Sequence, residues 1–209
     1  MLRYQTIKPG DIIVSSPSMT KGLVFSKSVI LVMSHDKNGS SGVIINKLLN
    51  TLDGDEILKS LQVSDSKKAI KGNLNIKNSV TLPVYFGGPV EQEKGIILHS
   101  NDYHATPSVN ITPEIAISTS SQIITDIVSH NGPMHKMLIL GYSSWAAGQL
   151  IAEIKRNDWL LLLDKNDDNN QPTSTFQLLF LEDNLYRWSY ALKLAGVNIA
   201  NYNSSTGNA

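Results

Sequence analysis

The sequence predicts an α/β protein, also classed as α+β, in which helices pack on a mixed β-sheet. Apolar runs of strand length joined by a short turn, as around Asn38-Gly39, are typical of antiparallel hairpins. Between Met137 and Leu163 a strand, a helix and a second strand follow one another, the plan of a helix that crosses a sheet. Because both kinds of connection occur, we expect both antiparallel and parallel neighbours in the sheet.

The first part of the chain is predicted to contain one early strand and a hairpin. Gly10–Pro17 has the composition of a strand that ends at proline. Ser28–Met33 is a continuous apolar run, which indicates a strand buried on both faces. His35–Ser41 contains the Asn-Gly turn, and Gly42–Asn46 is the expected returning strand.

The next part is predicted to contain a short helix, a connection and two strands. The helix covers Leu52–Leu61 with Thr51 as its cap. Ser64–Ser79 carries four lysines and little periodicity, so we expect an exposed connection. Strands are expected at Val80–Phe86 and Gly95–His99.

The stretch from Gly141 to Leu150 organises the second half of the chain. It follows an apolar strand, and we expect it to turn and open a helix that ends near Asn157, with Ser143 or Ser144 as N-cap. The residues with the spacing of one buried helical face are Ala147, Leu150, Ile151 and Ile154. Gln149, Glu153 and Arg156 are expected in solvent. A second helix is predicted within Ser118–Ser129.

The C-terminal part is predicted to end in a helix. Asp164–Thr175 has the composition of a polar connection, and Phe176–Leu181 that of a strand. Asp183 is expected to cap a last helix that ends at Gly196. Its predicted buried face consists of Leu185, Trp188, Leu192 and Ala195. We therefore predict a single domain over residues 1–200, with 64–79 as an exposed connection and 201–209 as a flexible tail.

Composition excludes several classes of function. Lysine plus arginine and aspartate plus glutamate are 18 each, so no net charge attracts a polyanion, and direct nucleic-acid binding is not expected. Cysteine is absent, which excludes disulfides and thiolate metal sites and fits a cytoplasmic location. The N-terminus lacks an apolar signal core, and no run approaches 18 apolar residues, so no membrane association is expected.

Several dispersed motifs occur together along the chain. They are Ser16-Pro17 with Phe25 and Ser28-Val29, His35 before a glycine-rich turn, Gly42–Asn46, Gly87–Val90, Leu98-His99, Gly141-Tyr142 through Trp145, Gly148–Leu150 with Glu153, Trp159, Trp188 and Gly196. With these motifs in this order, the chain resembles the AlgH/YqgE family of bacterial proteins over nearly its whole length.

The resemblance implies a curved, partly barrel-like mixed sheet with helices packed on it. It implies no activity, since no catalytic residue is established for the family, although some members are labelled transcriptional regulators on genetic grounds. One departure concerns Lys47-Leu48, which stands where the family usually has arginine and proline. If that arginine binds an anion, Lys47 would do so only as a point charge.

The main candidate for a ligand site combines Gly87, Gly88 and Pro89 with the predicted helix start at Ser143–Ala147, which includes Ser144 and Trp145. Glycines allow the backbone to approach a ligand, and a helix start presents free N–H groups to an anion. The alternative is that these glycines only form tight turns. Neither stretch matches a phosphate-loop or dinucleotide motif.

Other polar residues carry weaker signals. His35 beside Asp36 could act as a general base or serve as a hairpin residue, and Asn46 could hold a loop or contact a ligand. Ser143 and Ser144 could be nucleophiles or caps, but no nucleophile-elbow motif is present. The histidine spacings do not fit a metal site, so neither a metal nor a cofactor is expected.

We therefore expect a cytoplasmic, non-enzymatic protein that binds a partner protein or a small ligand, with any role in transcription indirect. An anion- or nucleotide-binding module that uses Gly87–Val90 and Ser143–Ala147 is one alternative. A hydrolase that depends on a serine or on His35 is another. The sequence leaves the oligomeric state open.

Overall fold

The computed structural model describes residues 7–19, 24–54, 56–57, 80–104, 106–162 and 174–197. Its elements in chain order are β1 (Ile12–Ser15), β2 (Val29–Asp36), β3 (Gly39–Ile44), β4 (Leu48–Asp53), β5 (Thr81–Phe86), β6 (Val90–Ser100), β7 (Ser108–Asn110), β8 (Ile115–Ser118), α2 (Ser121–Val128), β9 (Lys136–Ala146), α3 (Gln149–Lys155), β10 (Trp159–Leu162), α4 (Ser174–Phe176), the π-helix η2 (Gln177–Leu181) and α5 (Arg187–Leu194). None of the helices in these ranges has the length and apolarity to cross a membrane.

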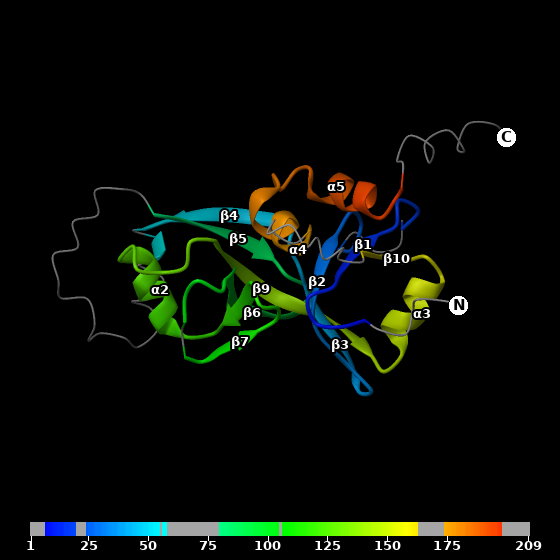
Figure 1. The fold of residues 1–209 in the computed structure, drawn as a ribbon, viewed down its shortest axis with the longest axis horizontal. Helices are drawn as coiled ribbons and strands as arrows, with labels where there is room; N and C mark the ends of the chain where they lie inside the picture. Colours follow the sequence, from blue (N-terminus) through cyan, green and yellow to red (C-terminus); the bar gives the residue numbers. More distant parts are fainter. Residues whose placement is uncertain are drawn as a thin grey trace.

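The strands form one curled mixed sheet, which confirms the predicted fold class (Figure 1). The main path is β10-β1-β2-β3-β9-β6-β8-β7, and β5 pairs with both β4 and β9. All pairs are antiparallel except β5 with β9. The long strand β9 connects the two halves of the sheet, because its first part pairs with β5 and β6 and its last part with β3.

Helices cover both faces of the sheet. On one face α4, η2 and α5 pack on a core that runs through β1, β2, β3, β6 and β9. The opposite face carries two separate cores, one under α3 and one under α2. Alternate residues of β2 enter different cores, Val29 and Leu31 on one face and Ile30 and Val32 on the other. All four are buried, so the prediction of a strand covered on both faces is confirmed.

The predicted hairpin and crossover are also confirmed. The β2–β3 turn is closed by Asp36, whose carboxylate accepts hydrogen bonds from the N–H groups of Asn38 at 2.7 Å and Gly39 at 3.3 Å. The helix α3 connects β9 to β10, which are separated in the sheet by β3, β2 and β1. The successive antiparallel pairings make β9 and β10 run in the same direction, as a helical crossover requires.

The predicted helix start at Ser143–Ala147 is wrong. Strand β9 continues to Ala146, because Gly42 pairs with Ser143 and Gly39 with Ala146 along the hairpin. The residues from Ser143 to Ala146 alternate between buried and exposed, which is the strand period. Helix α3 begins only at Gln149, after Gly148 in the left-handed region (φ +74°), so neither serine is its cap.

Two other predicted elements differ from the structure. Phe176–Leu181 is helical and places Leu178 and Leu179 in the core, so the strand prediction was wrong. A short apolar run suits a buried helix as well as a strand, which explains the error. Thr51 lies in strand β4, paired with β5, and does not cap a helix.

The cap at the end of β4 is Asp53. Its carboxylate accepts from the Glu56 N–H at 2.9 Å, while its own N–H donates to the Glu56 carboxylate at 2.9 Å, a reciprocal capping box. The rest of the predicted helix, residues 58–61, lies outside the described residues. So do the predicted connection 64–79, most of the connection 164–175, and the tail 201–209.

The last helix is close to its prediction. Asp183 accepts a hydrogen bond from the Leu185 N–H at 2.8 Å and closes the turn before the helix. The helix itself begins at Arg187 with Tyr186 as its N-cap, so the prediction of Asp183 as its cap was wrong. Gly196 follows its C-terminus with φ +78°. Leu192 is buried as expected, but Leu185 is 82% exposed and does not belong to the buried face.

His99 on β6 is a buried histidine with an unusual environment. Its Nδ1 lies 2.8 Å from the carbonyl oxygen of Ser100, so this nitrogen carries the hydrogen and Nε2 is an acceptor. Nε2 is buried and has no hydrogen-bond partner within the described part of the chain. Burial lowers the pKa of His99 from its ordinary value of 6.5, because the charged ring is poorly solvated there.

We expect His99 to make the fold less stable in mild acid. Below the ordinary pKa of 6.5 the unfolded chain binds a proton that the folded chain does not, so stability is present above that pH and is lost as the pH falls. Urea unfolding measures the free energy of unfolding at several pH values from about 7.5 to about 5.5. We expect this free energy to fall with the pH, and His99→Phe to reduce the slope by at most about 1.4 kcal/mol per pH unit. Identical pH dependence in the two proteins would contradict this role.

Candidate functional site

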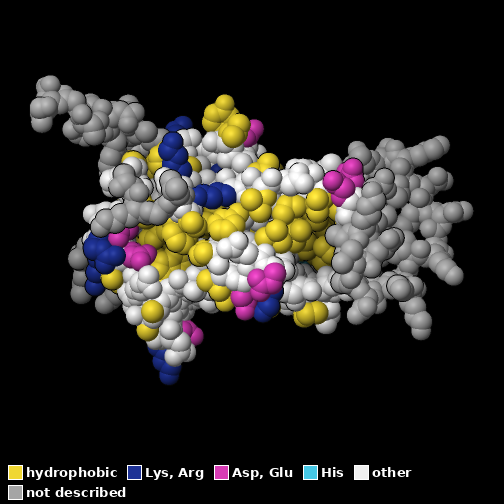
Figure 2. All heavy atoms as spheres, turned by 180° about the vertical axis from the view of Figure 1, so that it is seen from behind, with side chains coloured by type: hydrophobic (Ala, Val, Ile, Leu, Met, Phe, Trp, Pro, Cys, Tyr) yellow, Lys and Arg dark blue, Asp and Glu magenta, His cyan; other side chains and the backbone are white. Residues whose placement is uncertain are grey.

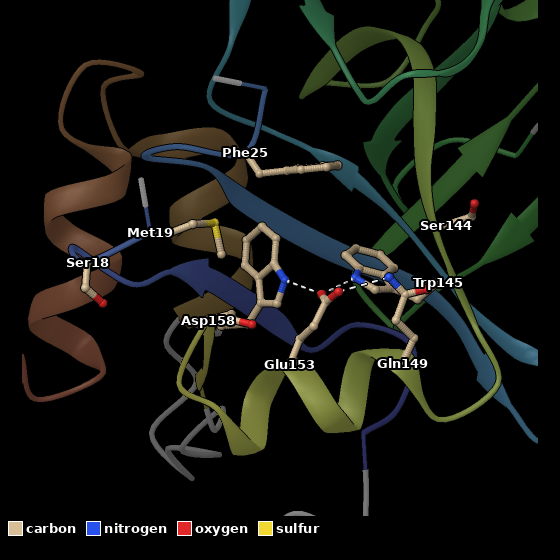
Figure 3. A pocket seen from close by; sticks show the side chains of 9 residues that line it. Ser18, Met19, Phe25, Ser144, Trp145, Gln149, Glu153 and Asp158 are labelled. Carbon is tan, nitrogen blue, oxygen red and sulfur yellow. Dashed lines mark hydrogen bonds between the residues drawn. The ribbon is translucent and has the colours of Figure 1, made fainter. Parts of the chain in front are cut away.

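A pocket of about 330 Å³ opens beside α3, between the end of β9 and the start of β10 (Figure 3). It lies on the face of the sheet that carries the α3 core. The residues that line it are Ser18, Met19, Phe25, Ser144, Trp145, Gln149, Glu153, Asp158 and Trp159.

The centre of the pocket, named the two-tryptophan pocket below, is a hydrogen-bonded group of Trp145, Trp159 and Glu153. Trp145 lies near the end of β9 and Trp159 begins β10, so the crossover helix brings the two indoles together. Glu153 projects from α3 between them (Figure 3). Its Oε2 accepts from the indole N–H of Trp145 at 2.8 Å and from that of Trp159 at 2.9 Å. One carboxylate oxygen therefore fixes the orientation of both rings.

A glutamine holds the glutamate in turn. Gln149 Nε2 donates to Glu153 Oε1 at 2.9 Å, across one turn of α3. Gln149 Oε1 accepts from the Ala146 N–H at 2.9 Å, at the end of β9. Glu153, which the sequence places in solvent, is thus half-buried with both oxygens hydrogen-bonded.

Three aromatic rings form the walls of the pocket. Trp145 and Trp159 meet at 82° with ring centres 6.1 Å apart, and Phe25 meets Trp159 at 78° and 5.9 Å. The two tryptophans are only 6% and 2% exposed, so packing restrains them from behind. Such edge-to-face contacts add to the stability of the group beyond the area they bury.

The charged side chains that line the pocket are both acidic. Besides Glu153, Asp158 contributes a carboxylate, whose Oδ2 accepts from Arg156 Nε at 3.1 Å and Nη2 at 2.9 Å. The ion pair is exposed, and Arg156 does not line the pocket. The pocket is therefore aromatic and acidic.

The turn Gly87–Pro89, the glycine corner of the predicted site, does not line this pocket, and backbone atoms pack closely against it. Gly87 donates its N–H to the Leu140 carbonyl at 2.8 Å and accepts from the Ile44 N–H at 2.9 Å. A Cβ on Gly88 would lie 2.2 Å from the carbonyl carbon of Tyr142. The structure brings this corner against β9 as expected, but backbone fills the space between them. Pro89 beside it is exposed.

The two serines occupy different surroundings. Ser143 is buried and its hydroxyl donates to the Gly87 carbonyl at 3.3 Å. Ser144 is exposed at the edge of the two-tryptophan pocket, and its side chain points away from the indoles (Figure 3).

His35 and Asn46 make structural contacts. His35 Nδ1 lies 2.7 Å from the Ser40 hydroxyl, across the hairpin. The Asn46 amide accepts from the Val29 N–H and donates to the Lys27 carbonyl, each at 2.8 Å, so it holds a loop. The neighbouring Lys47 ammonium donates to the Val24 carbonyl, and burial lowers the pKa of Lys47.

Of the residues predicted to form a site, Ser144 and Trp145 line this pocket and the others do not. Glu153, Gln149 and Trp159 were not among the candidates, although tryptophans at both ends of a short helix that carries a glutamate were a usable signal. In the described ranges no group of three or more His, Cys, Asp or Glu side chains could hold a metal ion. The lysines at 67, 68, 71 and 77 lie outside those ranges.

Comparison with known proteins identifies the family. The AlgH-like family model matches residues 12–200. A UPF0301 protein of Rickettsia canadensis is 35% identical over 201 residues, covering 96% of this chain and 95% of that protein, and one of Rickettsia felis is 34% identical with the same coverage.

Solved structures agree. The solution structure of the AlgH protein from Pseudomonas aeruginosa has a TM-score of 0.66 at 26% identity and covers 96% of this chain and 95% of that one. A crystal structure from Corynebacterium diphtheriae, with a TM-score of 0.55 at 21% identity over 77% of this chain and 78% of that one, has a similar fold. The prediction of the family is confirmed, and the chain belongs to the AlgH-like family of proteins.

Proposed function

We propose that this protein acts in the cytoplasm as a non-enzymatic binding protein whose ligand occupies the two-tryptophan pocket. The ligand is a small molecule or one side chain of a partner protein, and any effect on transcription is indirect. The observation that carries the proposal is the Glu153 carboxylate, which holds both indoles in place before a ligand arrives. A restrained aromatic wall with few polar groups is typical of binding pockets.

The surroundings of the candidate nucleophiles support binding over hydrolysis. The Ser143 hydroxyl is buried against a backbone carbonyl, and the nitrogen of His35 that is hydrogen-bonded faces Ser40. An acyl-transfer site needs its base within hydrogen-bond reach of the nucleophile, and neither Ser143 nor Ser144 makes such a contact with His35 in the described residues.

The anion-binding alternative loses the helix start on which it depended. Helix α3 begins at Gln149 and follows a strand, so the N–H groups of residues 143–147 are not those of a helix terminus.

A thermal-shift screen tests the proposed function. We expect at least one compound of a metabolite library to raise the melting temperature of the wild-type protein. Phe25→Ala, which removes one wall of the pocket, should abolish that shift. Phe180→Ala is the matched control, because it deletes the same ring from the core on the other face of the sheet. A ligand whose shift survives Phe25→Ala, or a library with no ligand, would contradict the proposal.

A further inference from the structure

We propose that the two-tryptophan pocket binds an organic cation: an ammonium or guanidinium group on a short apolar stem. The inference rests on the proposed function, since it names the ligand class of the same pocket. The same chemistry occurs in free alkylamines and in lysine or arginine side chains of a partner protein. The experiment below separates these two sources.

The charge of the lining selects against anions. Glu153 and Asp158 are its ionisable side chains, and among the described residues no lysine, arginine or histidine lines the pocket. An anion would lie close to two carboxylates and to no cation of this lining, and like charges at this range repel. A cation placed in the same position is attracted by Glu153 and, less strongly, by Asp158, because the Arg156 guanidinium already offsets part of the Asp158 charge.

The hydrogen bonds of the two indoles also favour a cation as the ligand. Both indole N–H groups donate to Glu153 Oε2, so their hydrogens are already used. An indole nitrogen is a donor only. The exposed part of each tryptophan, 6% of Trp145 and 2% of Trp159, therefore offers a ligand apolar contact and π electrons rather than hydrogen bonds. Tryptophan is the ring that attracts cations most strongly, at up to about 6 Å from its centre.

The shape of the pocket sets the size of the ligand. Trp145 and Trp159 stand at 82°, so they form two walls rather than one flat surface. Met19 and Phe25 add apolar surface to the lining (Figure 3), and the Phe25 ring meets that of Trp159 with centres 5.9 Å apart. A volume of about 330 Å³ is at the lower end of the range for ligand pockets. It leaves room for a charged head on a stem of about four carbons.

A series of four-carbon probes tests the role of charge. Butylammonium, 1-butanol and butyrate have similar shape and carry a positive charge, no charge and a negative charge. We expect butylammonium to shift the backbone amide signals of Gln149 and Glu153 in NMR titrations with a dissociation constant on the order of 1 mM. Butanol should bind roughly tenfold more weakly, and butyrate should show no saturation.

Charge variants of the protein provide the matched comparison. Asp158→Asn should weaken butylammonium binding roughly three- to fivefold, the effect of one partly exposed charge, and leave butanol binding unchanged. Glu93→Gln removes an exposed carboxylate of β6 outside the pocket. It should change neither the affinity for butylammonium nor the affinity for butanol. Equal binding of butanol or butyrate, or no effect of Asp158→Asn on butylammonium, would overturn the inference.

The outcome of the library screen separates this inference from the proposed function. If the probes fail but a neutral or acidic compound binds in a Phe25-dependent way, the pocket is a ligand site and the cation inference is wrong. If the probes and the whole library fail, both proposals are wrong.

Capped tripeptides with a central lysine or arginine separate the two sources of the cation. Binding as tight as that of butylammonium indicates a partner's side chain, because the pocket then tolerates a peptide backbone at its opening. Binding at least roughly tenfold weaker indicates a free small molecule, because the backbone is then excluded. Either result is consistent with a cation site and decides its source.

Discussion

Replacing Glu153 by leucine is expected to lower the free energy of unfolding by about 3 kcal/mol and to abolish ligand binding in the pocket. Leucine is similar in size but accepts no hydrogen bond, so the indole N–H groups of Trp145 and Trp159 both lose their acceptor. Each hydrogen bond to a charged group contributes about 1.5–3 kcal/mol, and a buried donor left without a partner costs a comparable amount. Urea unfolding of the wild type and the variant measures the difference.

Two further variants separate this effect from an ordinary surface change. Glu153→Gln keeps one acceptor oxygen for the indoles but turns an NH₂ group toward Gln149, so we expect a smaller loss of about 1–2 kcal/mol. Glu93→Leu changes an exposed glutamate and should cost less than about 0.5 kcal/mol. If Glu153→Leu is no more destabilising than Glu93→Leu, Glu153 does not hold the indoles.

Replacing Gly88 by alanine is expected to destabilise the fold by about 3 kcal/mol or more, a large part of the roughly 5–15 kcal/mol that stabilises a typical protein. The new Cβ would lie 2.2 Å from the Tyr142 carbonyl carbon and 2.5 Å from the Ser143 nitrogen. These are backbone atoms of β9, the strand that connects both halves of the sheet, so they cannot turn away as a side chain could. Thermal and urea unfolding measure the loss.

Gly148→Ala is the matched control for this substitution. Gly148 also has a positive φ, +74°, but no atom of the described residues lies within 4 Å of the position that a Cβ would occupy there. Alanine at this position should cost only the backbone strain, about 1–2 kcal/mol. A Gly88→Ala protein that folds normally but no longer binds a ligand would contradict the packing role and favour a ligand site at the glycine corner.

The elements that the sequence predicts well are those whose local chemistry has one solution. The Asn38-Gly39 turn with Asp36 before it favours a hairpin in any context, and the structure has that hairpin. The apolar run before it, Ser28–Met33, leads directly into this turn, which favours a strand over the buried helix that such a run could also form.

The errors occur where tertiary pairing decides between two local solutions. Ser143 and Ser144 are good helix caps, but the segment pairs with β3 and remains a strand. Phe176–Leu181 is as apolar as a buried strand, but it packs on the sheet as a helix. The prediction that Glu153 lies in solvent is wrong for a related reason. The helical spacing of the sequence does not show that two indole N–H groups from different strands meet at that face of α3.

A broad apolar surface is visible on the side of the molecule opposite to the view of Figure 1 (Figure 2). The exposed large apolar side chains of the described residues include Leu48 and Leu49 on β4 and Val109 on β7. Exposed apolar side chains are common on protein surfaces, and the proposed ligand site is the aromatic pocket beside α3, because the hydrogen bonds of Glu153 hold its rings in place.

The most direct test of the two-tryptophan pocket as the binding site is the indole region of a ¹H–¹⁵N NMR spectrum. The chain has three tryptophans, and the third, Trp188, donates its N–H to Ser15 on the other face of the sheet. During a titration with butylammonium, the indole signals of Trp145 and Trp159 should move together and saturate, while that of Trp188 stays in place. Stationary signals for both pocket tryptophans, or movement of Trp188 alone, would contradict the account.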